Sequence, residues 1–535
     1  MERNNKHIVN SKIFLYLTEF FAGMSVMAVE LGASRLLAPY FSSSQIVWTI
    51  IIGTIMIAMA LGNIYGGRSA DQSPDPARMY KRITVAAIWI ALIPVVGKYV
   101  IIGISAILIF SINSNYLIVA AFGACMTIFV FPLFLLGTVT PSLVKYSVDS
   151  LEDNGKTVGN LGAFNTIGSI IGTFVPTFIS IPAVGTSVTF LIFAGILLAL
   201  SIVFFISEKI CKKRIILSII IFLLCCGLGY SDSFAFWKKD LVYEGESVYN
   251  YLQVYEDEDE VALSTNVLFG VQSVYMKNKN LTGMYYDYAM AAPLMINGKD
   301  YSDMDVLILG MGTGTYATQC RKFLGDMKIE GVEIDEKITE LSRQYFSLSD
   351  DISVVTYDGR AYLNATKKKY DIIMVDAYQD ITIPFQMSSE EFFSLVKAHL
   401  KENGIMVVNM NIRGEKEGNI NQYLSDTIGK VFEWEYTVDV ANSTNRELFA
   451  SENPKMIKNL EGNIPKIDNT ELKDMMSKIS SNITPYKKGN HILTDDKAPV
   501  ELLGMQVIDD LIRDEVAYYK EIYKKYGIKG LMKEF

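Results

Sequence analysis

Apolar runs of about twenty residues recur through the first 230 positions, and this repetition constrains the fold more than any other feature of the chain. A helix of that length crosses the ~30 Å hydrocarbon layer of a bilayer. We place seven such runs and expect each to be a membrane-spanning helix: 13–33, 45–66, 83–103, 115–140, 160–181, 184–206 and 214–230. Residues 1–232 are therefore predicted to form a polytopic transmembrane domain.

The charge changes sign where the apolar runs stop. Residues 1–240 carry 17 of the 49 Lys and Arg and 11 of the 58 Asp and Glu, a net charge of +6, and the remaining residues have a net charge of −15. A basic, apolar first part followed by an acidic second part indicates a membrane domain joined to a soluble one. No Lys/Arg patch dominates the soluble part, so the expected partner is the lipid bilayer and not nucleic acid.

Cysteine and histidine give no framework for a disulfide or a metal. Of five cysteines only Cys320 belongs to the soluble part, and His7, His399 and His491 are far apart in sequence. No metal site is therefore predicted, although scattered carboxylates could still bind Mg²⁺.

Positive charge gathers in alternate connecting segments of the membrane part. The residues are Arg68, Arg78, Lys81, Arg82, Lys145, Lys156, Lys209, Lys212, Lys213 and Arg214. The positive-inside rule puts these segments and the N-terminus in the cytoplasm, so a seventh span would export the soluble part. The last run is short enough to be re-entrant or interfacial instead. Because the chemistry argued below needs a cytosolic metabolite, we expect a multi-pass cell-membrane protein with a cytosolic soluble domain, against the loop charges.

Two acids lie in the first apolar run, and two interpretations of them stay open. Glu19 and Glu30 are eleven residues apart, which puts them on nearly the same side of a helix. They could line a path for a cation or polyamine. Alternatively, Glu19 lies near the interface and Glu30 pairs with a cation such as Arg35. Small residues in the segment 168–172 predict close helix packing.

The soluble part begins with a β unit and continues as an α/β domain. Short alternating runs between Val248 and Met276 predict a small antiparallel β domain within 241–300. Wholly apolar strands then alternate with helical periods, which predicts a doubly wound, Rossmann-like α/β domain of the methyltransferase type over 301–510 and a helical tail over 511–535. The expected strands are Val306–Leu309, Ile329–Ile334, Ile352–Thr356, Ile372–Val375 and Ile405–Val408.

A glycine-rich turn follows the first of these strands. Gly310, Gly312 and Gly314 let the backbone turn tightly and approach a ligand at the start of the next helix. Glu333 ends the second strand, 23 residues after Gly310, and an acid there can accept both hydroxyls of a ribose. Asp335 has a separate function, the capping of the next helix.

The third and fourth strands also end in acids. Asp358, followed by Gly359, is placed to bond the exocyclic amine of an adenine, and Asp376 ends the fourth strand. Open α/β sheets bind ligands at these strand ends. A phosphorylated cofactor would be repelled by the acids, whereas a nucleoside with a cationic sulfur would be attracted, so an S-adenosyl ligand is the expected co-substrate.

Taken together, the motifs resemble the spermidine synthases (polyamine aminopropyltransferases), in particular their membrane-fused bacterial homologues. The resemblance covers roughly 240–510, and the first part resembles the fused membrane half. It rests on Gly310-Met-Gly-Thr-Gly, Glu333-Ile-Asp, Asp358-Gly, Tyr370-Asp-Ile-Ile-Met-Val-Asp, Leu493-Thr-Asp-Asp-Lys-Ala-Pro-Val-Glu and Tyr243-Glu-Gly-Glu-Ser-Val-Tyr.

The resemblance implies aminopropyl transfer from decarboxylated S-adenosylmethionine to putrescine, giving spermidine and methylthioadenosine with no permanently bound cofactor. It implies that Asp376 is the catalytic carboxylate, which also meets the need to deprotonate an attacking ammonium. Family members form dimers and tetramers, so a homo-oligomer is one expectation. The resemblance adds the following binding residues: Asn250, which stands where the family usually has a Gln, for the nucleoside, and Tyr285, Tyr286 and Asp380 for the amine substrate.

Two alternatives stay open, the first of them because of a departure from the family. Thr313 stands where members commonly have an Asp that holds the amine of the aminopropyl group. The first alternative is an S-adenosylmethionine-dependent methyltransferase, which would release S-adenosylhomocysteine. The second is a non-enzymatic polyamine transporter or sensor, in which Glu30 rather than Asp376 would be essential.

Overall fold

The computed structural model describes residues 11–41, 44–109, 116–147, 154–231, 233–236, 238, 240–267, 271–377, 383–411, 417–507, 513, 517–518, 521–522 and 524–527. The predicted site residue Asp380 and most of the predicted tail 511–535 lie outside these residues. The chain divides into two compact units. The first comprises Met1–Lys239, Glu244–Leu252 and Asn266–Leu268, and the second comprises Asp240–Tyr243, Gln253–Thr265 and Phe269–Phe535.

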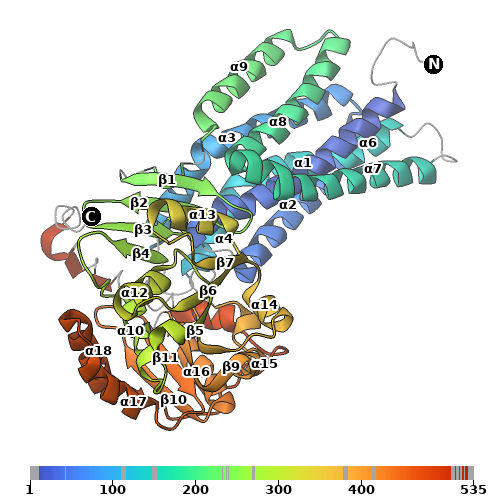
Figure 1. Cartoon of the computed structure of the whole chain (residues 1–535). Helices are drawn as coiled ribbons and strands as arrows, with labels where there is room; N and C mark the ends of the chain where they lie inside the picture. The colour runs from blue at the N-terminus through green and yellow to red at the C-terminus, as the bar shows by residue number, and fades with distance from the viewer. Residues whose placement is uncertain are drawn as a thin grey trace. The chain divides into compact units, whose positions relative to one another are not determined.

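The first unit is built mainly from helices, and each of the seven predicted apolar runs falls on one or more of them (Figure 1). The helices are α1 Lys12–Phe41, α2 Gln45–Gln72, α3 Pro76–Ile109, α4 Tyr116–Ile128, α5 Val130–Gly137, α6 Val139–Ser147, α7 Asn154–Val175, the π-helix Pro176–Ser180, α8 Ile181–Ser207 and α9 Lys212–Gly229.

Five helical stretches among the described residues are long and apolar enough to cross a membrane. The fifth contains two of the predicted runs and bends at Gly185, where φ is 81°. Three cations in the first turn of α9 distinguish it from these five. Seven spans therefore stay a prediction. The stretches are Lys12–Phe41, Gln45–Gln72, Pro76–Leu108, Val130–Ser147 and Gly155–Ser207.

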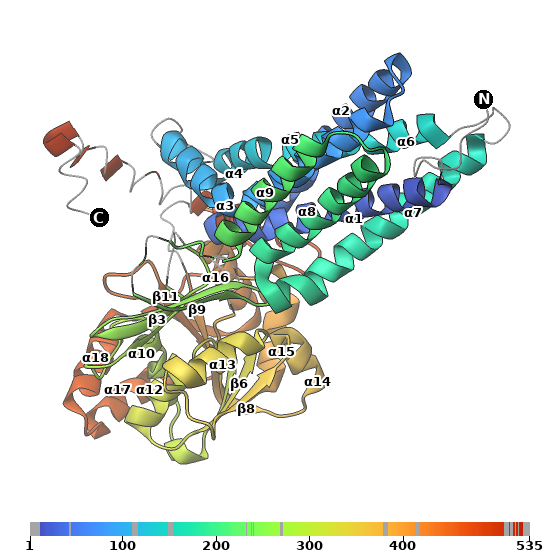
Figure 2. The same cartoon turned by 90° about the horizontal axis from the view of Figure 1, so that it is seen from above.

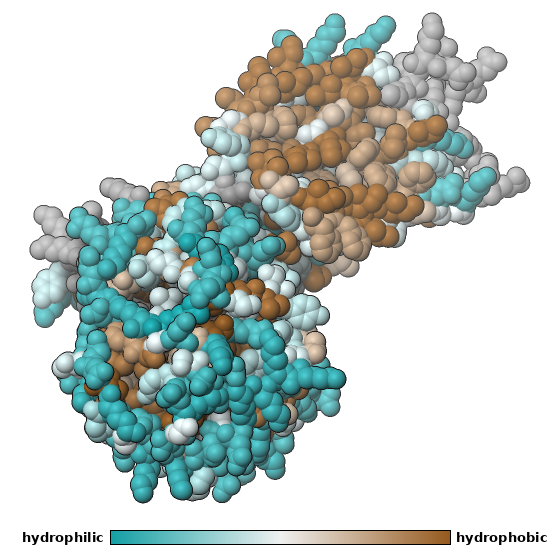
Figure 3. Space-filling view, viewed as in Figure 1, coloured by the Kyte–Doolittle hydropathy of each residue, from teal (hydrophilic) through white to brown (hydrophobic). Residues whose placement is uncertain are grey.

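Apolar side chains cover the visible outside of the helical unit, whereas polar ones cover most of the α/β unit (Figure 3). Large aliphatic side chains such as Ile57, Leu61, Ile64 and Leu223 are more than half exposed. Exposed apolar area on this scale is typical of a surface that contacts lipid or another protein.

Small residues allow α1 and α7 to pack backbone against backbone. A methyl group on Gly168 or Gly172 would collide with the backbone of Phe20 or Met24. The predicted close packing at 168–172 is therefore confirmed. Glu19 on α1 is fully buried, and its Oε1 accepts hydrogen bonds from Thr140 Oγ1 at 2.6 Å and Asn165 Nδ2 at 2.7 Å.

Four strands form a sheet with the order β1-β2-β3-β4 in the segment predicted as a β domain. They are β1 Leu241–Glu246, β2 Tyr251–Glu256, β3 Glu260–Ser264 and β4 Ser273–Met276. β3 pairs antiparallel with both β2 and β4. That this sheet is a separate domain stays a prediction, as do the other predicted domain boundaries.

The second unit contains an eight-stranded sheet with the order β12-β10-β11-β9-β8-β5-β6-β7. The five predicted parallel strands are confirmed, and this order is the Rossmann-like arrangement of the methyltransferase type. Three antiparallel strands, β10 to β12, extend the sheet beyond the predicted ones. The strands are β5 Asp305–Leu309, β6 Lys328–Glu333, β7 Ser353–Thr356, β8 Tyr370–Val375, β9 Leu400–Met410, β10 Trp434–Asp439, β11 Arg446–Ser451 and β12 Thr484–Pro485.

Helices cover both faces of this sheet and enclose one apolar core on each side (Figures 1 and 2). The first face packs against α10 Tyr285–Ala289, α11 Ala291–Leu294, α12 Thr315–Leu324, α17 Met456–Asn463 and α18 Thr470–Asn482. The second face packs against α14 Gly359–Ala365, α15 Glu390–His399 and α16 Ile420–Val431. The strand order reverses between β5 and β8, and that point is where open α/β sheets bind ligands.

Candidate functional site

Polar residues form a straight row across the carboxyl ends of the central strands. Leu309 pairs with Val332 on one side and with Val375 on the other, which aligns Gly310 with Glu333 and with Asp376. The residues before them belong to the core on the second face, so by alternation Glu333 and Asp376 point to the first face. Gly310 lies between them without a side chain.

Asp376 is at the centre of this row, directly after β8. Its Oδ2 accepts a hydrogen bond from Tyr285 Oη at 2.6 Å, and its Oδ1 accepts one from Asn409 Nδ2 at 2.9 Å. Burial raises the pKa of Asp376 to about 7, the two hydrogen bonds oppose this shift, and the charge of Glu333 adds to it. A carboxyl group with a pKa near neutrality is suited to proton transfer.

Glu333 ends β6 and holds the glycine turn. Its Oε2 accepts a hydrogen bond from the backbone N–H of Gly312 at 2.8 Å, and its Oε1 accepts one from that of Asp335 at 3.1 Å. Burial raises the pKa of Glu333 to about 7 in spite of these bonds. The turn requires glycine, since φ is positive at Gly310, Gly312 and Gly314. A Cβ on Gly310 would collide with the backbone of Asp376 and Ala377.

The acids that follow β6 and β7 both cap helices. Asp335 Oδ1 accepts from the backbone N–H of Lys337 at 3.1 Å at the start of α13 Glu336–Tyr345, as predicted. Asp358 Oδ1 accepts from the backbone N–H of Ala361 at 2.8 Å at the start of α14, which Gly359 opens. β7 lies next to β6, so Asp358 follows the strand beside Glu333. Its bond to adenine stays a prediction.

The two predicted tyrosines open α10, and their rings contact each other with centroids 3.9 Å apart and planes tilted by 38°. Tyr285 binds Asp376, whereas Tyr286 donates from Oη to the carbonyl oxygen of Gln272 at 2.8 Å. Tyr285 therefore contacts the predicted catalytic acid. Tyr286 lies beside Tyr285 and is held by the hydrogen bond to the backbone of Gln272.

The sequence analysis also singled out Asn250, Asp380 and Thr313. Asn250 belongs to the first compact unit, where its backbone N–H donates to Ser247 Oγ at 2.9 Å. Asp380 lies outside the described residues. Thr313 is buried, its N–H donates to Ser273 Oγ at 3.4 Å, and its Oγ1 lies 3.2 Å from Thr315 Oγ1.

Two further members of the row escaped the sequence analysis. Asn409 follows the apolar run of β9, and the rule that marks polar residues at strand ends would have found it. Glu447 pairs with Asn409 from the antiparallel strand β11, on which that rule does not apply. The sequence signal for Glu447 is its spacing from Phe449: residues two apart on a strand share a face, and Phe449 belongs to the core on the first face.

The row is acidic and lacks cationic partners. No ion pair joins Glu333, Asp376 or Glu447 to a Lys or Arg in the part of the chain that the structure describes. No group of three or more His, Cys, Asp and Glu is placed to hold a metal ion among the described residues. A row of buried acids without counter-charges attracts a cationic ligand.

Comparisons with known proteins agree with the sequence motifs. A family model described as the spermine/spermidine synthase domain matches residues 285–442. A probable polyamine aminopropyl transferase of Bifidobacterium longum is 49% identical over 352 residues, which are 63% of this chain and 78% of the relative. A polyamine aminopropyltransferase of Vibrio vulnificus is 27% identical over 200 residues, which are 36% of this chain and 65% of the relative.

Among solved structures, this chain is similar to a probable spermidine synthase from Corynebacterium glutamicum. The two are 18% identical, the TM-score is 0.37, and the match covers 46% of this chain and 96% of the other.

Proposed function

This chain belongs to the polyamine aminopropyltransferase family, its reaction is aminopropyl transfer, and on that premise we propose that the acceptor is putrescine and the donor decarboxylated S-adenosylmethionine. The products would be spermidine and methylthioadenosine. The observation that carries this proposal is the buried acidic row, because both substrates are cations and no Lys or Arg among the described residues forms an ion pair with the acids of the row.

The reaction replaces one bond of the donor. The acceptor nitrogen arrives as an ammonium with a pKa near ~10 and must lose a proton before its lone pair can attack. The lone pair forms a bond to the methylene carbon next to the sulfur, and the carbon–sulfur bond breaks. Its electron pair stays on sulfur, so the sulfonium becomes a neutral thioether.

Asp376 is the proposed proton acceptor. Its pKa of about 7 is closer to that of an amine than the pKa of an ordinary Asp is, which eases the proton transfer. Tyr285 and Asn409 hold the two carboxylate oxygens, so the group is oriented before the substrate binds.

The donor nucleoside is assigned to the end of the row at Glu333. Glu333 would accept the ribose hydroxyls, the backbone of Gly310, Gly312 and Gly314 would lie against the nucleoside, and Asp358 with Gly359 would bind the adenine. The position of Glu333 beside the glycine turn supports this assignment. We assign Tyr286, Asp380 and Asn250 to substrate binding from the family pattern alone.

The helical unit is proposed to anchor the enzyme in the cell membrane, with the catalytic unit in the cytosol, where a soluble metabolite can reach it. Five apolar helical stretches support the anchoring. We propose no permanent cofactor, since the donor leaves as methylthioadenosine, and a homo-oligomer in line with the family.

The test is to supply the purified full-length chain in detergent with labelled decarboxylated donor and a panel of amines. We expect label to appear in spermidine and methylthioadenosine to form in equal amount. Transfer to a different amine would overturn the assignment of putrescine. Release of S-adenosylhomocysteine from S-adenosylmethionine, with no product from the decarboxylated donor, would overturn the assignment of the donor.

A further inference from the structure

Glu447 is a buried acid that the mechanism above does not use. Its side chain is fully buried on β11, and neither Oε1 nor Oε2 has a hydrogen-bond partner among the described residues. A polar group left in this state costs stability, on the order of 1–3 kcal/mol. A position that retains an unpartnered acid at such a cost is a candidate for ligand binding.

The strand register puts Glu447 in the same row as Asp376. Val375 pairs with Val408, which aligns Asp376 with Asn409, and Asn409 pairs with Glu447. All three side chains point to the first face, so the row continues past Asp376 for two more strands. At the usual strand spacing the backbones of Asp376 and Glu447 are roughly 10 Å apart.

The two ends of the row are equivalent in spacing but not in function. Glu333 is also two strands from Asp376, with Gly310 between them. In the proposed function the nucleoside occupies that side, so a molecule that presents its nitrogen to Asp376 extends toward Asn409 and Glu447. An extended diamine has its second ammonium at that end.

Electrostatics favour a cation at Glu447. Burial raises the pKa of this carboxyl well above its usual range, and the negative charge of Asp376 raises it further. Burial and the charge of Asp376 therefore disfavour the ionised form of Glu447 as long as no positive charge is nearby. An ammonium ion would stabilise the ionised carboxylate and supply the hydrogen-bond donors that the described residues do not provide.

We infer that Glu447 binds the far ammonium of the acceptor and so makes the enzyme select diamines over monoamines. This inference rests on the proposed function, since it needs an amine acceptor at Asp376. It does not concern the donor, whose nucleoside lies on the opposite side of Asp376.

A matched control exists on the opposite face of the same sheet. Glu435 on β10 is 3% exposed, and both of its carboxylate oxygens also lack partners among the described residues. It pairs with Ala450, which belongs to the core on the second face, away from the row. Glu435→Gln therefore reproduces the loss of a buried carboxyl without touching the proposed site.

The experiment compares kcat/KM for putrescine and for butylamine, which has the same carbon chain and one amine. In Glu447→Gln we expect kcat/KM for putrescine to fall on the order of 10- to 100-fold, as for a lost hydrogen bond to a charged group. The value for butylamine should change less than ~3-fold. In Glu435→Gln, the ratio of kcat/KM for putrescine to kcat/KM for butylamine should equal that of the unaltered enzyme.

The inference is overturned if Glu447→Gln keeps that ratio, or if the KM of the donor rises in place of that of the diamine. If the unaltered enzyme transfers the aminopropyl group to no amine, the proposed function fails. This outcome is distinguishable from a failure of the inference about Glu447. Should Glu447→Gln fail to fold, as judged by its melting temperature and methylthioadenosine binding, Glu447→Asp carries the test. A shorter carboxylate should shift preference from putrescine toward the five-carbon diamine, and an unshifted preference contradicts the inference.

Discussion

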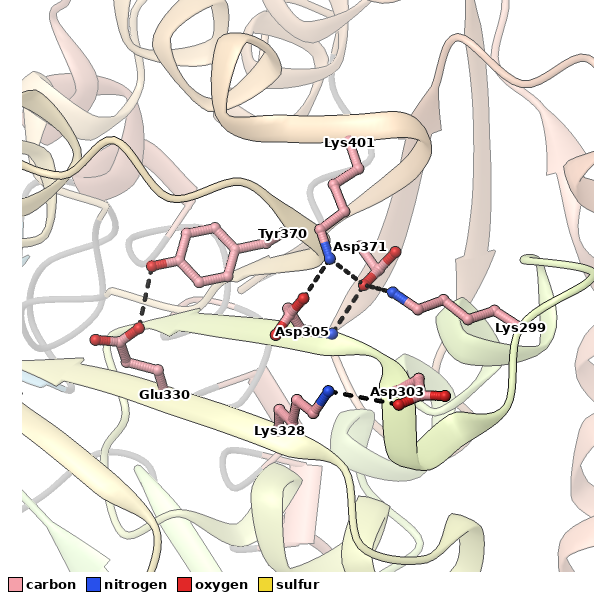
Figure 4. Close-up of polar contacts among 8 residues, drawn as sticks. All are labelled: Lys299, Asp303, Asp305, Lys328, Glu330, Tyr370, Asp371 and Lys401. Carbon is pink, nitrogen blue, oxygen red and sulfur yellow. Dashed lines mark hydrogen bonds and ion pairs between the residues drawn. The ribbon is translucent and has the colours of Figure 1, made fainter.

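Both edges of the α/β sheet carry acids on the central strands β5, β6 and β8, but among the described residues only the acids toward the amino ends of these strands form ion pairs. At the amino ends of the strands, Asp371 lies 2.6 Å from Lys299 Nζ and 2.9 Å from Lys401 Nζ, and Lys401 also pairs with Asp305 (Figure 4). Lys368 pairs with Glu330 at 3.0 Å on β6. At the carboxyl ends no such pair exists for Glu333, Asp376 or Glu447 within the described residues.

Two aspartates on one strand show what this difference does. Asp371 is the second residue of β8, and Asp376 directly follows the end of the strand, five residues later. Burial raises the pKa of both, but hydrogen bonds from Lys299, from the backbone of Asp305 and from Lys401 outweigh it for Asp371, whose pKa is lowered. For Asp376 burial wins, and the pKa rises to about 7.

The comparison indicates which acids serve structure and which await a ligand. An acid that is paired within the protein stays ionised and ties its strands together, as Asp371 does. An acid that is buried without a cation is costly unless a cationic substrate supplies the missing charge.

Replacing Asp376 or Asp371 should give the largest difference in kcat between the two edges. Asp376→Asn keeps the shape of the side chain but cannot accept the proton, so we expect kcat to fall ~10²–10⁴-fold, the usual contribution of general-base catalysis. Asp371→Asn should leave kcat within ~3-fold and lower the melting temperature instead, because it breaks two lysine contacts. Equal loss of kcat in both variants would remove the distinction between the edges.

The two glutamates of β6 give the second test. Glu333→Gln should weaken methylthioadenosine binding on the order of 10- to 100-fold, because hydrogen bonds to a charged acceptor are lost. Glu330→Gln, three residues earlier on the same strand, should leave this affinity unchanged. Isothermal titration of the full chain in detergent measures both, and an unaltered affinity in Glu333→Gln would refute its role with the ribose.

The third test concerns the protonation of Asp376. The carboxyl must be ionised to accept a proton, so kcat/KM should rise with pH through about 7. Asn409 donates to this carboxylate and lowers its pKa, so Asn409→Ala should move the acid limb of the profile to higher pH. We expect a loss of ~10-fold below pH 7 that shrinks on the alkaline side. A profile that is scaled down without a shift would mean that Asn409 acts only through packing.

The positions of the glycine turn, Glu333 and Asp376 were predictable from the sequence, whereas that of Glu447 was not, for a physical reason. The glycine turn, Glu333 and Asp376 follow apolar parallel strands, and the carboxyl ends of such strands always meet at one edge. Asn409 obeys the same rule. Glu447 does not, because β11 is antiparallel and its register depends on pairing with β9, which no local pattern encodes.

The acids at the amino edge show a second limit of sequence reasoning. Asp371 and Asp376 have the same side chain on the same strand, and their different pKa values come from Lys299 and Lys401, distant in sequence. The helical unit shows the reverse case. Its apolar runs and the glycines at 168 and 172 are local features, and both were readable from the sequence.

Glu435 separates the effect of burial from that of position, because it has no ion pair within the described residues and lies outside the row. Burial raises its pKa to about 9, although the charge of Lys488 opposes the shift. A raised pKa in the folded state means that the folded protein binds more protons than the unfolded chain, so stability is lost as pH rises from about 4.5 to about 9. Glu435→Gln should remove this loss and raise the melting temperature at pH 8 by roughly 5 °C, with no gain at pH 4.

Transfer activity of Glu435→Gln should stay within ~2-fold of the unaltered enzyme, the smallest effect expected here. A buried acid without an ion pair is thus a cost to stability wherever it occurs, and in the proposed function only its place in the row makes it useful to catalysis. If Glu435→Gln reduced transfer as much as Glu447→Gln, burial alone would explain both losses. The position of Glu447 in the row would then not be needed to bind the acceptor.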